Sequence, residues 1–210
     1  RDFDQSTIVM GHLGPQRLHP DMYDLAVYDK YFGDGAWGSL LFSEIRSKLG
    51  LAYSIYGDFS GGPVAGTYAI ALQTRNAEAL NAVERVKDLV IKSATDMAAP
   101  SAYEEAKHQI NRSFVFKFPN ARSVVERNAI LELLKYPKDF DSSYLDKIAA
   151  VTSASSLAAA KRHVKPSDLV IVIVGNVSPQ EVRRRFGGKL RVYSLNFDHA
   201  PHVDNHFPVE

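Results

Sequence analysis

The sequence contains no cysteine among its 210 residues. This absence excludes disulfide bonds, thiolate zinc sites and a cysteine nucleophile, and it is compatible with either an oxidising or a reducing compartment. Long hydrophobic runs are also missing, because no apolar stretch approaches the ~20 residues that cross a bilayer. The first residues, R-D-F-D-Q-S, offer neither a methionine nor a signal-peptide core. We therefore expect this chain to be a piece of a longer protein.

An excess of one charge is the next feature that the sequence lacks. It has 25 basic and 24 acidic residues, a formal net charge of +1, and no block of like charges. Composition thus gives no argument for a nucleic-acid partner or a membrane-surface partner. With 45% hydrophobic residues the chain is long enough to bury a core. We expect one globular domain over residues 1–210, with its core at about 5–195 and a tail at 196–210.

Several catalytic motifs are absent as well. There is no Walker sequence, no G-x-S-x-G elbow, no zinc-knuckle spacing and no RNA-binding aromatic box. The sequence also lacks His-x-x-Glu-His, in which two histidines one helical turn apart hold zinc and the glutamate activates water. Four histidines have no histidine partner three or four residues away and are interpreted as structural: His12, His19, His108 and His163.

The C-terminal tail carries the densest group of possible metal ligands. These are His199, His202 and His206, together with Asp198 just before them and Asp204 among them. Ordering a proline-interrupted terminus around an ion costs conformational entropy. We therefore predict that this chain holds no metal and no other cofactor of its own.

Residues 39–54, S-L-L-F-S-E-I-R-S-K-L-G-L-A-Y-S, are the most informative stretch that is present. Apolar residues at 41, 42, 45 and 49 follow the three- and four-residue steps of one helical face. Ser39 is available as the N-cap, and Gly50 stands where a helix commonly ends in a left-handed turn. From Ala52 onward the pattern becomes extended. The sequence thus predicts a short amphipathic helix, a sharp corner and a strand.

Arg46 and Tyr53 lie on either side of this corner. An arginine near a helix C-terminus ordinarily serves the helix dipole, and a tyrosine that opens a strand ordinarily packs on the sheet. The corner also allows a fixed cation and a fixed phenol to face the same space. Spacing alone does not decide between the structural and the functional interpretation.

Residues 33–38 spell G-x-G-x-x-G, a pattern that indicates a dinucleotide site only when it leaves a strand and opens a helix. Here a helix is expected on both sides, so a tight turn between two packed helices is favoured. Asp58 stands about where a ribose-binding acid is expected, which keeps a Rossmann-type site as the alternative.

The other elements follow from hydrophobic periodicity and turn residues. Strands are predicted over 6–12, 52–59, 64–74 and 169–174, the last buried on both faces, and an edge strand over 190–195. Helices are predicted over 22–32, 77–97, 101–116 with a capping box, 120–136, 143–149 and 152–163, and from Ser178 onward. This order favours an α+β fold, a mostly antiparallel sheet with helices packed on one face.

The run S-x-L-F-x-E-I-R-x-K-x-G-L-A-Y-S resembles the C-terminal lobe of the pitrilysin/insulinase family of zinc peptidases, which includes the mitochondrial processing peptidases. The resemblance continues through 66–74, E-E-A-K at 104–107, S-F-V-F at 113–116, 148–152 and 169–175. It covers most of residues 5–176. One departure is Leu40, where the family often has arginine.

The resemblance implies a lobe that lacks the zinc motif and binds substrate for a zinc-dependent metalloendopeptidase acting on extended peptides or unfolded polypeptides. Arg46 and Tyr53 have the seven-residue separation of the family's substrate-binding arginine and tyrosine. Zinc is then expected in a partner lobe, either in the same chain or in another subunit. The alternatives are an inactive scaffold or assembly subunit with the same fold, and the inactive partner of a two-chain peptidase. We expect a bacterial periplasmic or cytosolic location.

Overall fold

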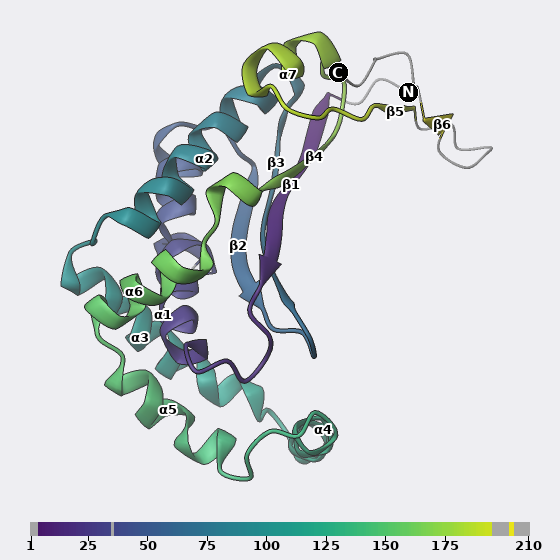
Figure 1. Ribbon diagram of the computed structural model, residues 1–210. Helices are drawn as coiled ribbons and strands as arrows, with labels where there is room; N and C mark the ends of the chain where they lie inside the picture. The colour runs from purple at the N-terminus through teal and green to yellow at the C-terminus, as the bar shows by residue number, and fades with distance from the viewer. Residues whose placement is uncertain (1–3, 35, 195–201, 204–210) are drawn as a thin grey trace.

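The computed structural model describes residues 4–34, 36–194 and 202–203 of the chain (Figure 1). Its main sheet has the strand order β2-β3-β1-β4, and every neighbouring pair is antiparallel. The strands are β1 (Gln5–Gly14), β2 (Ser54–Ser60), β3 (Gly66–Arg75) and β4 (Val170–Val174). This arrangement confirms the predicted α+β fold with an antiparallel sheet.

Alternation of side chains divides the sheet into two unlike faces. On β1 the buried residues Ile8 and Met10 point to one face, whereas Val9 between them is exposed. The register places Val9 opposite Ala71 of β3 and opposite Val172 of β4, so all three lie on the outer face. Period-two alternation therefore leaves one face of the sheet for the core and one face open.

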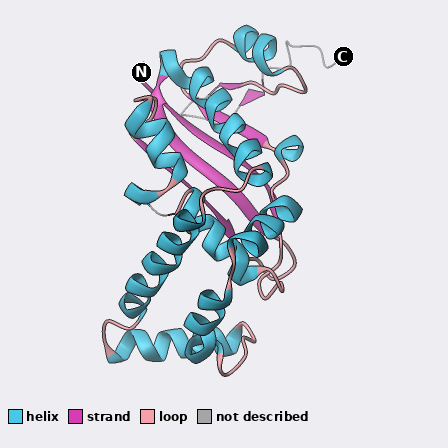
Figure 2. Cartoon of the chain, turned by 90° about the vertical axis from the view of Figure 1, so that its left-hand side faces the viewer, coloured by secondary structure: helices cyan, strands magenta, loops and turns pink. Residues whose placement is uncertain are grey.

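The inner face is covered by α1 (Met22–Phe32), α2 (Ala79–Thr95) and α6 (Ser153–His163), as Figures 1 and 2 show. The main core contains side chains from each of these helices together with the inward residues of the sheet. Helix α2 contributes a continuous apolar stripe that includes Val83, Val86 and Val90, all fully buried. This confirms the prediction that its stripe belongs to the core.

A second group of helices extends beyond the sheet (Figure 2). It consists of α3 (Pro100–Phe114), α4 (Ala121–Leu133) and α5 (Phe140–Ala150). A smaller core holds α3 and α5 against α1, with Tyr103 and Ile148 among its buried residues. No residue of α4 is buried, although Asn120 caps it by accepting a hydrogen bond from the Ser123 amide at 2.9 Å.

The C-terminal part contains α7 (Pro179–Phe186), β5 (Tyr193–Ser194) and β6 (His202–Val203). The predicted edge strand over 190–195 is thus reduced to two residues of a separate ladder with β6. Short helical turns complete the chain: η1 (Ala36–Gly38), η2 (Phe42–Lys48), η3 (Asn76–Glu78), η4 (Val115–Lys117) and η5 (Pro166–Asp168). Of the possible metal ligands in the tail, for which no metal binding was predicted, 198, 199, 204 and 206 lie outside the described residues, as does the side chain of His202.

Two predictions about individual elements are wrong. Strand β4 is not buried on both faces, since Val170 and Val172 are 66% and 53% exposed. An apolar run looks the same in sequence whether one face or both are covered, and here β4 shares the exposed outer face of the sheet with Val9 of β1. The predicted capping box at residues 101–104 is also absent, because α3 begins at Pro100 without a side-chain cap. Proline suits the first helical turn, where its missing N–H costs nothing.

The glycine segment 33–38 follows α1 and not a strand, so the Rossmann alternative is wrong. At Gly33 the chain passes very close to β2: a Cβ there would lie 2.3 Å from the Gly57 carbonyl oxygen. Glycine is required at this position by the close approach of two backbones.

Candidate functional site

The helix before the corner is wound more loosely than predicted. From Phe42 to Lys48 it is a π-helix, in which the Leu49 amide donates to the carbonyl oxygen of Glu44 at 3.2 Å. The buried face predicted from periodicity is correct at Leu41, Phe42 and Ile45, whereas Leu49, the fourth residue of the predicted stripe, is 50% exposed. Over only two helical turns, the spacing of apolar side chains does not reveal whether each amide bonds to the carbonyl four residues earlier, as in an α-helix, or five residues earlier, as in a π-helix. Short π segments inside helices are frequent at functional sites.

The two ends of this segment match the predictions from the sequence. The Ser39 hydroxyl accepts a hydrogen bond from the Phe42 amide at 3.3 Å. Gly50 has a φ of 62°, the left-handed conformation expected after the helix. The Leu51 amide then donates to the Ile45 carbonyl at 2.9 Å, which fixes the chain beyond the turn. The corner is therefore held by backbone hydrogen bonds on both sides.

Arg46 is half-buried against aromatic rings. Its guanidinium carbon lies 4.6 Å from the Phe42 ring centroid and 5.5 Å from that of Trp37. The nearby acid Glu44 pairs with Lys48 at 2.6 Å instead. Among residues 4–34 and 36–194, no carboxylate forms an ion pair with Arg46. Arg46 is thus positioned by cation–π contacts, which leave its N–H donors available.

Tyr53 lies on the other side of the turn, immediately before β2. Its backbone is fixed, since its amide donates to the Gln73 carbonyl at 2.8 Å. Its side chain is 53% exposed. Tyr53 is therefore a phenol on a rigid support with access to solvent.

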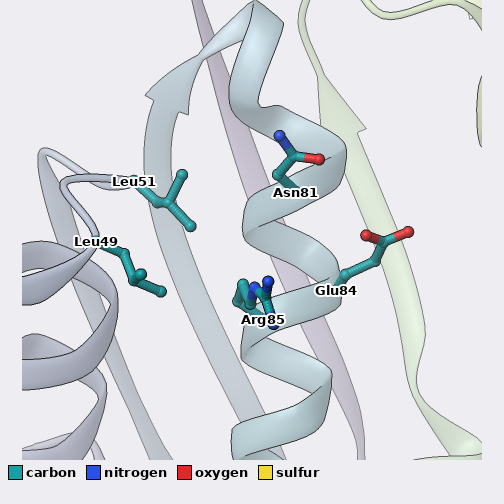
Figure 3. A pocket seen from close by; sticks show the side chains of 5 residues that line it. All are labelled: Leu49, Leu51, Asn81, Glu84 and Arg85. Carbon is teal, nitrogen blue, oxygen red and sulfur yellow. The ribbon is translucent and has the colours of Figure 1, made fainter.

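Two shallow pockets flank the residues between the turn and the strand. One, of about 310 Å³, is lined by Leu49, Leu51, Asn81, Glu84 and Arg85, and Figure 3 shows both leucines extending from the turn toward α2. The other, of about 270 Å³, is lined by Gly50, Leu51, Ala52, Tyr53 and Arg75. The structure thus brings Tyr53 and Arg75 to one pocket, whereas Arg46 lines neither.

Sequence reasoning missed two participants in this region. Trp37 contributes a ring beside Arg46, and Arg75 contributes a second cation near Tyr53. Arg75 reaches the corner because the register pairs Ser54 with Gln73, which brings the end of β3 alongside the start of β2. The register follows from the tertiary structure, so no local pattern carries this signal.

The histidine predicted to be structural in β1 is confirmed as such. Nδ1 of His12 donates to the Leu13 carbonyl at 2.9 Å, and Nε2 accepts from the Lys165 amide at 3.0 Å. The ring also packs against Tyr68, with 4.9 Å between ring centroids. Both ring nitrogens are satisfied within the fold, so His12 is not a free ligand.

Comparison with known proteins gives a consistent result. The family model described as the peptidase M16 inactive domain matches residues 1–110. An uncharacterized zinc protease of Bacillus subtilis, YmxG, is 27% identical over 134 residues, which are 64% of this chain and 32% of that protein. The chain therefore spans about a third of the length of this curated relative.

Solved structures show the same fold. The peptidase M16 inactive domain from Pseudomonas fluorescens superposes with a TM-score of 0.77 at 23% identity, over 83% of this chain and 42% of that one. A chain of complex III from Candida albicans gives a TM-score of 0.71 at 16% identity, over 83% of this chain and 44% of that one. In the part of the chain that the structure describes, no helix is long and apolar enough to cross a membrane.

Proposed function

Because the chain belongs to the peptidase M16 inactive-domain family, we propose that it is the substrate-binding, non-catalytic lobe of a zinc-dependent metalloendopeptidase. This family membership confirms the resemblance seen in the sequence. The proposed substrates are extended peptides or unfolded polypeptides. The observation that carries the proposal is the rigid corner that presents the Arg46 guanidinium and the Tyr53 phenol.

The residues of this chain do not fit the peptidase zinc. The His-x-x-Glu-His motif is absent, so the metal and its activated water are assigned to a partner lobe. The contribution of this chain is hydrogen-bond donation. Arg46 has guanidinium donors without an ion-pair partner among the described residues, and Tyr53 is 53% exposed and carries a phenol. Substrate carbonyl oxygens, or the oxyanion that develops during amide hydrolysis, are suitable acceptors for both.

The exposed outer face of the sheet supports the proposal that a second lobe packs against this chain. Val9, Leu13, Val170, Val172 and Val174 are all exposed on this face, and in Figure 1 the covering helices α1, α2 and α6 lie on the opposite side of the sheet. Exposed apolar patches of this kind commonly mark interaction surfaces. A facing lobe that closes over a polypeptide suits this surface.

A second function remains as the alternative, namely an inactive scaffold or assembly subunit. Its support is the fold shared with a chain of complex III from Candida albicans. In this alternative Arg46 and Tyr53 are packing residues, and no peptide enters the space beside them.

Reconstitution separates the two functions. We expect the tagged chain to capture a protein that carries His-x-x-Glu-His, or its own longer chain to contain that motif, and the combination to hydrolyse an unfolded polypeptide. The isolated chain hydrolyses nothing. Capture of a non-peptidase complex alone, without peptidase activity in any combination, would favour the scaffold and reject the proposal.

A further inference from the structure

Three potential metal ligands that are distant in sequence converge at the start of α1 and the end of α6. They are His19 in the loop before α1, Asp21 at the N-cap of α1 and His163, the last residue of α6. One ligand atom from each lies within 4.8 Å of the others. The side chains are between 15% and 32% exposed, so they are accessible without being mobile surface groups. We propose that His19, Asp21 and His163 bind a divalent transition-metal ion of the zinc type.

The geometry suits such an ion. Nε2 of His163 lies 2.8 Å from Oδ2 of Asp21, and Nδ1 of His19 lies 3.9 Å from the same oxygen. Ligand atoms that bind one zinc ion at ~2.0–2.1 Å in a tetrahedron are about 3.3 Å apart. These two separations bracket this value, and all three ligand atoms lie within 4.8 Å of one another, so side-chain rotations can bring them to one ion. Two imidazoles and one carboxylate also form a ligand set that transition metals favour and magnesium does not.

The residues are arranged to keep the carboxylate ionised. A hydrogen bond from Arg162, helped by a lesser one with His163, holds the pKa of Asp21 below its usual value, although burial opposes this shift. Without metal, His19 Nδ1 accepts a hydrogen bond from the Asp21 amide at 3.1 Å, and metal binding replaces this bond. The site is distinct from the peptidase zinc, because none of its ligands belongs to a His-x-x-Glu-His motif, and it does not depend on the proposed function.

Substitution of Arg162 distinguishes a metal site from a purely structural ion-pair network. Nε of Arg162 lies 2.9 Å from Oδ2 of Asp21, and its Nη2 lies 2.9 Å from Oδ1. This guanidinium therefore competes with a metal ion for the carboxylate. If the cluster is only a structural ion-pair network, Arg162→Gln weakens it and has no effect on metal. If the cluster is a metal site, Arg162→Gln raises the affinity for the ion.

The test is a metal titration of the full 210-residue chain in which His199, His202 and His206 are all replaced by Asn, to remove the ligands of the tail. Thermal unfolding is followed with Zn²⁺, Co²⁺ and Mg²⁺. At zinc near 100 times its Kd, the melting temperature should rise by about 5–10 °C. Mg²⁺ should give no comparable shift. Co²⁺ should produce the visible absorption bands of a nitrogen- and oxygen-ligated ion.

Variants then assign the ligands. His19→Gln and His163→Gln should each lower zinc affinity at least tenfold, Arg162→Gln should raise it several-fold, and His108→Ala, at an exposed histidine on α3, should leave it unchanged. A zinc shift that survives His163→Gln overturns the proposal, as does an equal shift with Mg²⁺. The cobalt spectrum of the protein with intact His19 and His163 needs no ligand variant to fold, and absence of the bands at saturating Co²⁺ also overturns it.

Discussion

The guanidinium of Arg46 lies over the ring of Phe42, with 4.6 Å between the guanidinium carbon and the ring centroid. Phe42 is itself held in the core, since it is only 8% exposed. A long flexible side chain is thereby held on a fixed aromatic surface. Fewer rotamers of Arg46 then have to be given up when a ligand binds, which is a form of preorganisation.

The second ring beside Arg46 belongs to Trp37, which is 81% exposed and also contacts the Phe42 ring, with 5.1 Å between the ring centroids. We predict that Trp37→Ala in the active enzyme lowers kcat/KM about two- to fivefold, because an exposed cation–π contact is worth ~0.5–1 kcal/mol. The free energy of unfolding should change by less than ~0.5 kcal/mol. Trp37→Phe, which keeps a ring, is the matched control. If Trp37→Phe lost as much activity as Trp37→Ala, the cation–π contact with the ring at position 37 would not be what positions Arg46.

Two glycines test the backbone argument by chemical denaturation. Gly33→Ala places a Cβ 2.3 Å from the Gly57 carbonyl oxygen, so β2 or α1 must shift, and we expect a loss of ~3 kcal/mol or more. In Gly50→Ala the new Cβ has no atom within 4 Å. The expected loss in the free energy of unfolding is therefore only the cost of a left-handed φ of 62° for alanine, about 1 kcal/mol. The reverse order of the two losses would contradict the observed packing of α1 on β2.

The sequence predicted the parts of this fold that depend on local pattern. Runs of β-branched and apolar residues bounded by turn residues located β1 and β3, Gly50 marked the left-handed end of the helix, and the covered face of α2 followed from its apolar stripe. The exposure of Val170 and Val172 was not predictable, because it depends on whether another layer covers the outer face of the sheet, where Val9 of the central strand β1 is exposed as well. In the candidate site, Arg46 and Tyr53 came from a family resemblance. Trp37 and Arg75 required the tertiary structure, as did the convergence of His19 with His163.

Asp29 on α1 is a buried carboxyl whose burial raises its pKa well above the ordinary value. Its Oδ2 accepts a hydrogen bond from the Phe59 amide at 3.1 Å, whereas its Oδ1 has no partner. The folded state therefore retains a proton that the unfolded state has lost. The contribution of Asp29 to stability is greatest below the unfolded pKa, near 4, and declines as pH rises toward the folded pKa.

We predict that Asp29→Asn keeps the acceptor for Phe59 and removes this decline. The variant should be at least as stable as the wild type at pH 7, and its free energy of unfolding should fall less steeply between pH 4 and pH 7. Urea denaturation across this range measures both quantities. Asp88→Asn, at an exposed acid on α2 that pairs with Arg85, is the control and should leave the slope nearly unchanged. A wild type that gains stability relative to Asp29→Asn as pH rises would contradict the raised pKa.

The role of the corner is tested by kcat/KM for an unfolded polypeptide, measured on the enzyme that contains this chain and its zinc-motif lobe. Arg46→Ala and Tyr53→Phe are compared with Arg122→Ala and Tyr193→Phe, which alter exposed residues on α4 and β5. If Arg46 and Tyr53 donate hydrogen bonds to the reacting substrate, each of their variants loses on the order of 10²- to 10³-fold with the zinc content unchanged, and the two controls retain full activity. Wild-type kcat/KM in both Arg46→Ala and Tyr53→Phe would contradict the proposed role.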